Sequence, residues 1–216
     1  MSAESRLRER ICLLARSMFE RGLTSGSSGN ISARTEGGGL LVTPTGSSFG
    51  TLDPAQLSVI DATGRHIEGD APTKEMALHS AFYETRGIAT GAVVHLHSTH
   101  SVALSMQRDV DPDNVLPPLT AYSIMRLGKV ALLPYFRPGD PAMGEAVRGL
   151  AGKRTAVLLA NHGPVVAAKD LEAAVYAVEE LEETAKLALL MRGTNPVMLT
   201  AEQIRDVVTT FKVEWD

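Results

Sequence analysis

The sequence has one cysteine, no excess of positive charge and no long apolar run. Cys12 cannot form an internal disulfide, and the charged stretch 1–10 lacks the apolar core of a secretory signal, so we expect a cytoplasmic protein. Lys and Arg number 21 against 25 Asp and Glu, a net charge of −4 that gives no broad positive field for nucleic acid. Apolar runs such as 187–191 stop far short of the ~20 residues that cross a bilayer. We therefore expect neither nucleic acid nor a membrane as a partner.

The remaining composition is that of a folded globular protein. Hydrophobic residues make up 44% and charged residues 21% of the 216 positions, and this length suits one hydrophobic core, so we expect a single domain over 1–216. Apolar spacing and turn-forming residues predict helices at 5–21, 73–86 and 170–192, and another that begins at 140–141. They predict strands at 31–34, 40–43, 57–60, 65–68, 92–97, 130–133, 155–160 and 165–168. The pattern indicates an α/β fold in which helices cover a mixed or mostly antiparallel sheet.

Two histidines, His95 and His97, lie two residues apart in the apolar run 92–97. Side chains alternate along a strand, so both imidazoles project from one face and converge on one point. A strand that supplies two zinc ligands uses this spacing. A hydrogen-bonded pair of strand histidines has the same spacing, so His-x-His alone does not separate the two interpretations.

Two further residues favour a metal site. His162 directly follows the apolar run 155–160, where a strand end meets a loop, and Glu75 opens an expected helix. With His95 and His97 they complete three imidazoles and one carboxylate, a set that zinc accepts. Taken singly, His162 is more typical of a capping or core histidine, and Glu75 of a first-turn acid favoured by the helix dipole. Spacing alone also allows His79, four residues after Glu75, as a ligand.

Five short motifs occur in order along the chain: Ser28-Gly29-Asn30, Thr43-Pro44-Thr45-Gly46, Pro72-Thr73-Lys74-Glu75, Val94-His95-Leu96-His97-Ser98 and Asn161-His162-Gly163. Over nearly its whole length the sequence resembles, in these motifs and their spacing, the class II aldolase/epimerase family that includes fuculose-phosphate aldolase. Within that family the runs 24–30, 95–99, 134–140 and 160–166 are most similar to the 3-oxo-tetronate 4-phosphate decarboxylases.

The resemblance implies a site, a fold and an assembly. His95, His97 and His162 would bind one Zn²⁺ per chain, with Mn²⁺ or Co²⁺ as possible substitutes, and Glu75 would be both a ligand and the catalytic acid/base. His79 is a neighbour in this pattern rather than a ligand. The fold would be a three-layer α/β/α sandwich around a mixed, largely antiparallel sheet, the class II aldolase fold, and the assembly a homotetramer.

Small residues gather in three places where a phosphate could bind. Backbone N–H groups and hydroxyls of such residues curl around an anion without side-chain clashes, and a helix N-terminus favours negative charge. From the residues alone, the Ser/Gly stretch is more commonly a flexible turn, and Lys74 is equally a solvated lysine. The resemblance implies that the three clusters converge on a substrate phosphate; they are Ser28, Gly29 and Asn30, then Thr45 and Gly46, then Thr73 and Lys74.

The implied reaction is the zinc-dependent decarboxylation of 3-oxo-tetronate 4-phosphate to dihydroxyacetone phosphate and carbon dioxide in sugar-acid catabolism. A ketone β to the carboxylate lets the electrons left by carbon dioxide delocalise as an enediolate, whose charge a metal stabilises. Glu75 is the expected proton donor to the enediolate carbon. Tyr122 matches a tyrosine that acts as an acid across a subunit boundary in related aldolases, and it is equally a packed aromatic. Arg126 and Arg137 are candidates for holding the carboxylate, although surface ion pairs are the commoner role of arginine.

Two alternative functions remain. Retro-aldol cleavage of a sugar phosphate, as in fuculose-phosphate aldolase, gives the same enediolate, so the metal and phosphate residues do not separate an aldehyde-lyase from a carboxy-lyase. A non-catalytic scaffold of the adducin type uses the same fold but would lose the ligands, whereas all four are present. The C-terminal run 209–216, which holds the lone tryptophan Trp215, either closes over a site or packs on a neighbour.

Overall fold

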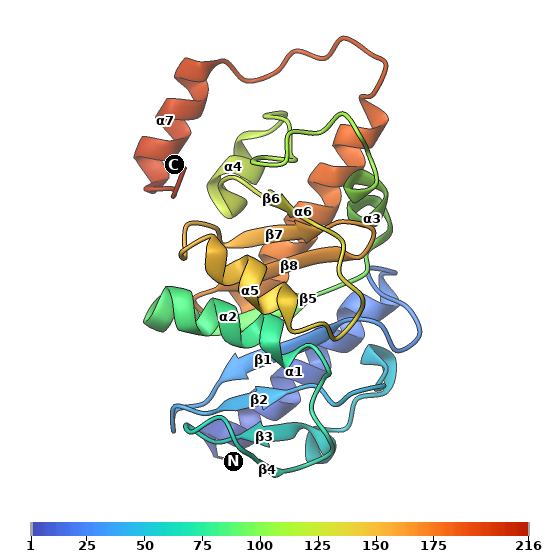
Figure 1. Cartoon of the computed structure of the whole chain (residues 1–216), viewed down its shortest axis with the longest axis vertical. Coiled ribbons are helices and arrows are strands. Elements are labelled where there is room, and N and C mark those ends of the chain that lie inside the picture. The colour runs from blue at the N-terminus through green and yellow to red at the C-terminus, as the bar shows by residue number, and fades with distance from the viewer. Residues whose placement is uncertain (1, 216) are drawn as a thin grey trace.

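Strands that are apolar on both sides need cover on both faces of their sheet. The computed structural model, which describes residues 2–215, provides it with an eight-stranded sheet between two layers of helices (Figure 1). The order across the sheet is β4-β3-β2-β1-β5-β8-β7-β6, and all neighbours are antiparallel except the parallel pair β6 and β7. The strands are β1 (Asn30–Arg34), β2 (Leu40–Val42), β3 (Ser58–Ile60), β4 (His66–Glu68), β5 (Ala92–His95), β6 (Ala131–Leu133), β7 (Ala156–Leu159) and β8 (Gly163–Ala168).

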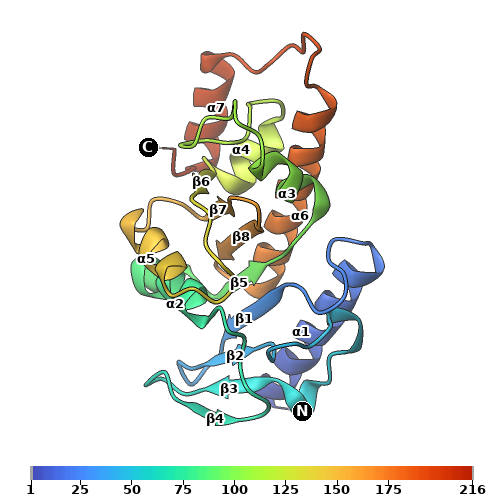
Figure 2. The same cartoon turned by 45° about the vertical axis from the view of Figure 1, so that its right-hand side comes forward.

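Helices lie on both sides of this sheet, as the two views show together (Figure 2). Within residues 2–215, no helix combines the length and the apolar character that crossing a membrane requires. Three short 3₁₀ turns, Phe49–Thr51, Pro54–Gln56 and Gly87–Ala89, complete the elements. The α-helices are α1 (Ala3–Glu20), α2 (Met76–Arg86), α3 (Thr99–Ser105), α4 (Ala121–Leu127), α5 (Ala142–Gly149), α6 (Leu171–Leu190) and α7 (Ala201–Phe211).

Side-chain alternation along the central strands assigns each residue to one of two hydrophobic clusters. Val93 of β5 and Val165 of β8 face α2 and α5, where Phe82 belongs to the same cluster. Their sequence neighbours Val94 and Val166 point the other way, into the cluster formed with α1 and α6. The three-layer α/β/α sandwich with a mixed, largely antiparallel sheet is therefore confirmed.

The strand predicted at 92–97 is too long, because β5 ends at His95. On one side β5 pairs with β1, whose first residue, Asn30, lies opposite His95. Gly29, with φ of 83°, turns the chain just before Asn30, so β1 offers no partner beyond that position. His97 therefore lies past the strand end.

The helix predicted from residue 73 begins instead at Met76, with Glu75 at its N-cap position. Thr73 Oγ1 accepts the Glu75 N–H at 3.3 Å, so Thr73 braces the segment before the helix rather than the helix itself. The Glu75 side chain makes no cap hydrogen bond and is free to face the sheet. The helix predicted from 140–141 likewise starts one position late, at Ala142, whose N–H is accepted by Asp140 Oδ1 at 3.0 Å.

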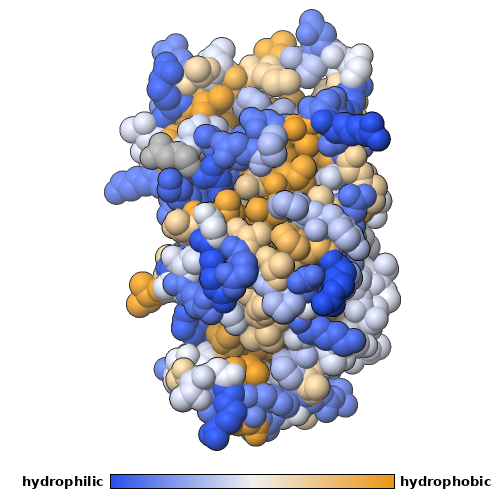
Figure 3. Space-filling view, viewed as in Figure 1, coloured by the Kyte–Doolittle hydropathy of each residue, from blue (hydrophilic) through white to orange (hydrophobic). Residues whose placement is uncertain are grey.

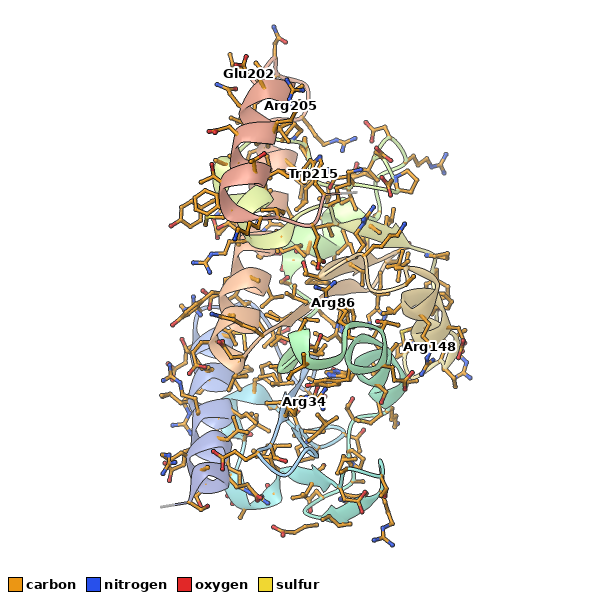
Figure 4. All side chains as sticks on the ribbon, turned by 90° about the vertical axis from the view of Figure 1, so that its left-hand side faces the viewer. Arg34, Arg86, Arg148, Glu202, Arg205 and Trp215 are labelled. Atoms are coloured by element: carbon orange, nitrogen blue, oxygen red, sulfur yellow. The ribbon has the colours of Figure 1, made fainter. Side chains whose placement is uncertain are left out.

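The C-terminal segment packs on its own chain. Glu214 pairs with Arg86 at 2.9 Å, and the Trp215 ring lies 6.0 Å from Lys129 Nζ, on the side of the molecule seen in Figure 4. Residue 216 lies outside the described residues. The helices α3 and α4 were not predicted, because seven residues are too few to establish a helical period; the C-terminal α7 was missed although its apolar residues do follow that period.

Candidate metal centre and phosphate cradle

Three histidine rings meet at the edge of the sheet where β5 and the β7–β8 turn come together. His97 Nε2 lies 3.1 Å from both His95 Nε2 and His162 Nε2, and the ligand atoms of all three lie within 4.8 Å of one another. Two nitrogens bound to one tetrahedral zinc at 2.0–2.1 Å would lie about 3.3–3.4 Å apart. The three nitrogens therefore have a spacing that suits one shared cation.

The backbone positions these rings. His95 Nδ1 donates to the Pro164 carbonyl oxygen at 2.8 Å, which fixes the tautomer and leaves the Nε2 lone pair free to face the centre. His162 lies in the β7–β8 turn after Asn161, whose φ of 56° makes the turn tight. A Cβ on Gly163 would lie 2.2 Å from the Leu96 carbonyl oxygen. Glycine at this position thus lets the turn approach the main chain that carries His97.

Glu75, at the N-cap position of α2, reaches the same three histidines. Its Oε2 lies 3.4 Å from His95 Nε2 and accepts from Asn30 Nδ2 at 2.7 Å, and its Oε1 lies 3.4 Å from His162 Nε2. Glu75 is 6% exposed, and Oε1 has no hydrogen-bond partner among residues 2–215. A buried carboxylate oxygen without a partner is costly unless a cation neutralises it. Three imidazole nitrogens and this carboxylate are a donor set that fits a divalent ion such as Zn²⁺.

The electrostatics of the centre favour the forms of these groups that bind metals. Burial lowers the pKa of His95 to about 4, and burial likewise lowers the pKa values of His97 and His162. Burial alone would raise the pKa of Glu75, but the neighbouring His95 ring and the Asn30 amide outweigh it, and that pKa falls below its usual value. At neutral pH the rings are neutral and the carboxylate is ionised, as metal ligation requires.

A cavity of about 160 Å³ lies beside the metal centre, and we call it the phosphate cradle. Gly29 and Gly46 both have φ above 70°, and a Cβ on Gly29 would lie 2.9 Å from the His95 carbonyl oxygen, so at Gly29 the wall is backbone with no room for a side chain. Lys74 is the one lysine or arginine that lines it in the part of the chain described. All seven residues predicted for phosphate line this cavity: Ser28, Gly29, Asn30, Thr45, Gly46, Thr73 and Lys74.

Besides Thr73, two side chains of the cradle are already engaged. Ser28 Oγ donates to the Ser25 carbonyl oxygen at 2.7 Å, and the Asn30 amide is shared between Glu75 and His79. A phosphate there would depend chiefly on backbone N–H groups, the Thr45 hydroxyl and Lys74.

A larger cavity of about 540 Å³, which we call the open cavity, lies on the other side of His97. His97 and Pro138 line both cavities, and His162 and Asn161 line the open one. Its remaining wall consists of Thr99, Val102, Tyr135 and Phe136, so none of its described lining residues is Lys or Arg. The sequence did not predict this wall; the one signal for it was the similarity of runs 134–140 and 160–166 to one subfamily.

Three predicted residues stand apart from these cavities. Tyr122, on α4, is 59% exposed, and the Arg126 guanidinium lies 5.9 Å from its ring. Arg137 faces Asp140 at 3.6 Å on the surface. None of the three lines either cavity within residues 2–215, so a role for Tyr122 in a neighbouring subunit stays a prediction.

The other histidines are not part of the cluster. His79 is fully buried and bonds Asn30 and Ser32 through its two ring nitrogens, so the ligand role that spacing alone allowed is not supported. His66 lies exposed on β4. His100, in the first turn of α3, bonds Glu182 at 2.8 Å.

The chain is similar to known proteins over most of its length. The chain is 48% identical over 194 residues to a 3-oxo-tetronate 4-phosphate decarboxylase of Cupriavidus necator, which covers 90% of this chain and 88% of that protein. An L-fuculose phosphate aldolase of Escherichia coli is 34% identical over 90% of this chain and 89% of its own. The crystal structure of Escherichia coli YgbL, a candidate aldolase/epimerase/decarboxylase, superposes with a TM-score of 0.92 at 45% identity, over 95% of this chain and 99% of that one. Residues 9–189 match the class II aldolase and adducin N-terminal domain, and the chain belongs to that family.

Proposed function

We propose that this protein is a metal-dependent carboxy-lyase that converts 3-oxo-tetronate 4-phosphate to dihydroxyacetone phosphate and carbon dioxide. The observation that carries the proposal is the arrangement of the two cavities: the cradle and the open cavity, which has no Lys or Arg in its described lining, meet at His97, a member of the histidine cluster. This arrangement matches a substrate with a phosphate at one end, a carboxylate at the other and a ketone between them. The 48% identity to a decarboxylase of that name supports the same substrate.

His95, His97, His162 and Glu75 would hold the ion, which we propose is one Zn²⁺ per chain, with Mn²⁺ or Co²⁺ as substitutes. When bound, a divalent cation supplies Lewis-acid stabilisation of the negative charge that develops on the ketone oxygen. The Pro164 carbonyl and the Asn30 amide keep His95 and Glu75 oriented towards it.

The cradle would anchor the phosphate end. Its backbone N–H groups surround the anion at fixed positions, and Lys74 adds a positive charge. With the phosphate fixed there, a four-carbon chain extends past His97 towards the open cavity. Anchoring by a remote group lowers the entropic cost of placing the reacting bond at the centre.

The open cavity would receive the carboxylate and favour its departure. Its described lining offers no Lys or Arg to pair with an ionised carboxylate, whereas neutral carbon dioxide loses little in such surroundings. The bond between the carboxylate and the hydroxyl-bearing carbon breaks, and its electron pair moves towards the ketone oxygen. That carbon then takes up one proton, which the ionised Glu75, lining the cradle, would first take from water and then deliver, so that each turnover consumes one proton from solvent.

The remaining parts of the proposal concern assembly and location. We propose a cytoplasmic homotetramer in which Tyr122 of one copy reaches the centre of a neighbour. The 59% exposure of Tyr122 on α4 supports this, as do the hydrophobic residues that gather in the upper half of the face in Figure 3. Light scattering of the purified protein should give about four times the mass of one chain.

Product analysis tests the proposed reaction. Protein loaded with Zn²⁺ should release carbon dioxide and dihydroxyacetone phosphate in equal amounts from 3-oxo-tetronate 4-phosphate. L-fuculose 1-phosphate, tested in parallel, should give little aldehyde. Aldehyde from the sugar phosphate without carbon dioxide from the acid would replace this proposal with the aldolase alternative.

A further inference from the structure

A line of buried hydrogen bonds leads away from the metal centre behind Glu75. Asn30 Nδ2 lies 2.7 Å from Glu75 Oε2, and Asn30 Oδ1 forms a short hydrogen bond with His79 Nε2. His79 Nδ1 lies 2.7 Å from Ser32 Oγ, which in turn lies 3.0 Å from the Tyr83 hydroxyl. Each of these five side chains belongs to a residue that is at most 8% exposed. We call them the Glu75 support line.

The direction of every bond in the support line follows from its end at Glu75. An ionised carboxylate only accepts, so Asn30 presents its NH₂ group to Glu75 and its carbonyl oxygen to His79. His79 must then carry its proton on Nε2, which leaves Nδ1 to accept from Ser32. Ser32 donates to that nitrogen and accepts from the Tyr83 hydroxyl. Burial keeps His79 neutral by lowering its pKa to about 3, in agreement with this single-proton state.

The far end of the line is held by packing. Tyr83 lies on α2, and the Arg34 guanidinium is 5.0 Å from the centre of its ring, on the side of the molecule shown in Figure 4. Ser32 lies on β1 and is fully buried. The line thus ties the metal centre to the contact between α2 and the sheet.

The support line cannot be a path for protons. A side-chain amide neither takes up a proton on its nitrogen nor passes one on at neutral pH, so Asn30 interrupts any transfer between His79 and Glu75. What the line can do is decide orientation. Without the His79 N–H, Asn30 Oδ1 becomes a buried acceptor with no partner, and the amide is no longer held in one orientation beside Glu75 Oε2.

We propose that His79 is a positioning residue: through Asn30 it holds Glu75 Oε2 and so leaves Oε1 free to face the histidine cluster. Oε1 is the atom that lacks a partner among residues 2–215 and lies 3.4 Å from His162 Nε2. Only the part of this inference that concerns turnover rests on the proposed function. The part that concerns the metal centre stands on the hydrogen bonds alone.

Two variants of His79 separate a hydrogen-bond role from a packing role. His79→Leu keeps the bulk and removes the donor to Asn30. His79→Gln places an amide N–H close to the position of the imidazole Nε2–H and keeps that donor. His66→Leu, which removes an exposed histidine of β4, is the matched control.

Cobalt binding is the first measurement, because it needs no substrate. We expect His79→Leu to bind Co²⁺ about 10–100-fold more weakly than the parent and to change the Co²⁺ absorption bands, as losses of outer hydrogen bonds do at metal sites. His79→Gln should recover most of the affinity, and His66→Leu should match the parent. In turnover, His79→Leu should lower kcat more than it raises KM.

Two outcomes would overturn the proposal. One is parental cobalt affinity and absorption in His79→Leu; the other is an equal loss in His79→Leu and His79→Gln, which would assign His79 a packing role alone. Should His79→Leu not fold, His79→Phe carries the test, since it also fills the buried position and removes the donor to Asn30; parental cobalt affinity and absorption there would also overturn the proposal. A parent that binds cobalt but releases no carbon dioxide would refute the proposed reaction and leave this inference standing.

Discussion

The phosphate cradle and the open cavity meet at His97 but differ in size and in the residues that line them. The cradle is small, about 160 Å³, with walls of backbone and small side chains and one lysine, Lys74. The open cavity is about 540 Å³ and is lined by rings and neutral side chains, with no Lys or Arg among its described lining. Under the proposed function, the first cavity would hold the phosphate and the second would receive the carboxylate. A substrate with an anion at each end would then be bound tightly at its phosphate and destabilised at its carboxylate.

The largest effect is expected from removing the residue that the two cavities share. His97→Ala should weaken binding of Zn²⁺ by more than the ~100-fold typical of an outer-shell change and abolish most turnover, because one of the clustered nitrogens is lost. Metal content after dialysis and steady-state turnover measure this. His66→Ala, on exposed β4, should behave as the parent. Full zinc content in His97→Ala would remove His97 from the ligand set.

The next effect separates chemistry from phosphate binding. Glu75→Gln should lower kcat by roughly 10²–10⁴-fold, the range that acid/base groups contribute, and change KM for the phosphorylated substrate only a few-fold. The matched control is Glu84→Gln on the same helix, where Glu84 pairs with Arg148 at the surface. Unchanged kcat in Glu75→Gln would exclude Glu75 as the proton donor.

A substitution in the cradle should change KM rather than kcat. Gly29→Ala places a Cβ 2.9 Å from the His95 carbonyl oxygen at φ of 83°, so we expect KM and the inhibition constant of inorganic phosphate to rise about tenfold, or ~1.4 kcal/mol. Gly26→Ala is the control for strain alone, because φ there is 59° and nothing lies within 4 Å of its Cβ. Phosphate inhibition that stays at the parental value in Gly29→Ala would place the phosphate elsewhere.

The smallest effect tests why the open cavity lacks a cation. Tyr135→Arg introduces a positive charge that stabilises the bound carboxylate more than the transition state, from which charge has moved to the ketone oxygen. We expect kcat to fall several-fold and KM to fall with it, whereas Tyr135→Gln should leave kcat closer to the parent. A higher kcat in Tyr135→Arg would mean that this site needs a cation at the carboxylate.

Much of the cradle and the metal centre could be predicted from sequence, because each of their residues belongs to a short local motif. The strand pairing that brings Asn30 opposite His95 joins segments far apart in the chain and was not part of that prediction. The resemblance then linked motifs that spacing alone left separate, and it correctly set His79 apart from the histidine cluster.

The open cavity and the support line could not be predicted, because they depend on contacts between distant segments. Tyr135 and Asn161 line one cavity although their positions in the sequence carry no common pattern. Ser32 reads as an ordinary strand residue until α2 is docked on the sheet. The predicted helix start at residue 73 was wrong for a related reason: the Glu75 side chain bonds Asn30 across the fold instead of capping its own helix.

Gly163 bears on which parts of the site could change substrate preference through substitution. Main chain rests on main chain there, since the Leu96 carbonyl oxygen occupies the space that any Cβ would need. The approach of the main chain next to His162 to the main chain next to His97 is therefore limited by a backbone contact rather than by side-chain packing. Substitutions at lining residues of the open cavity, such as Tyr135, could therefore change which substrate fits without changing this backbone contact beside the histidine cluster.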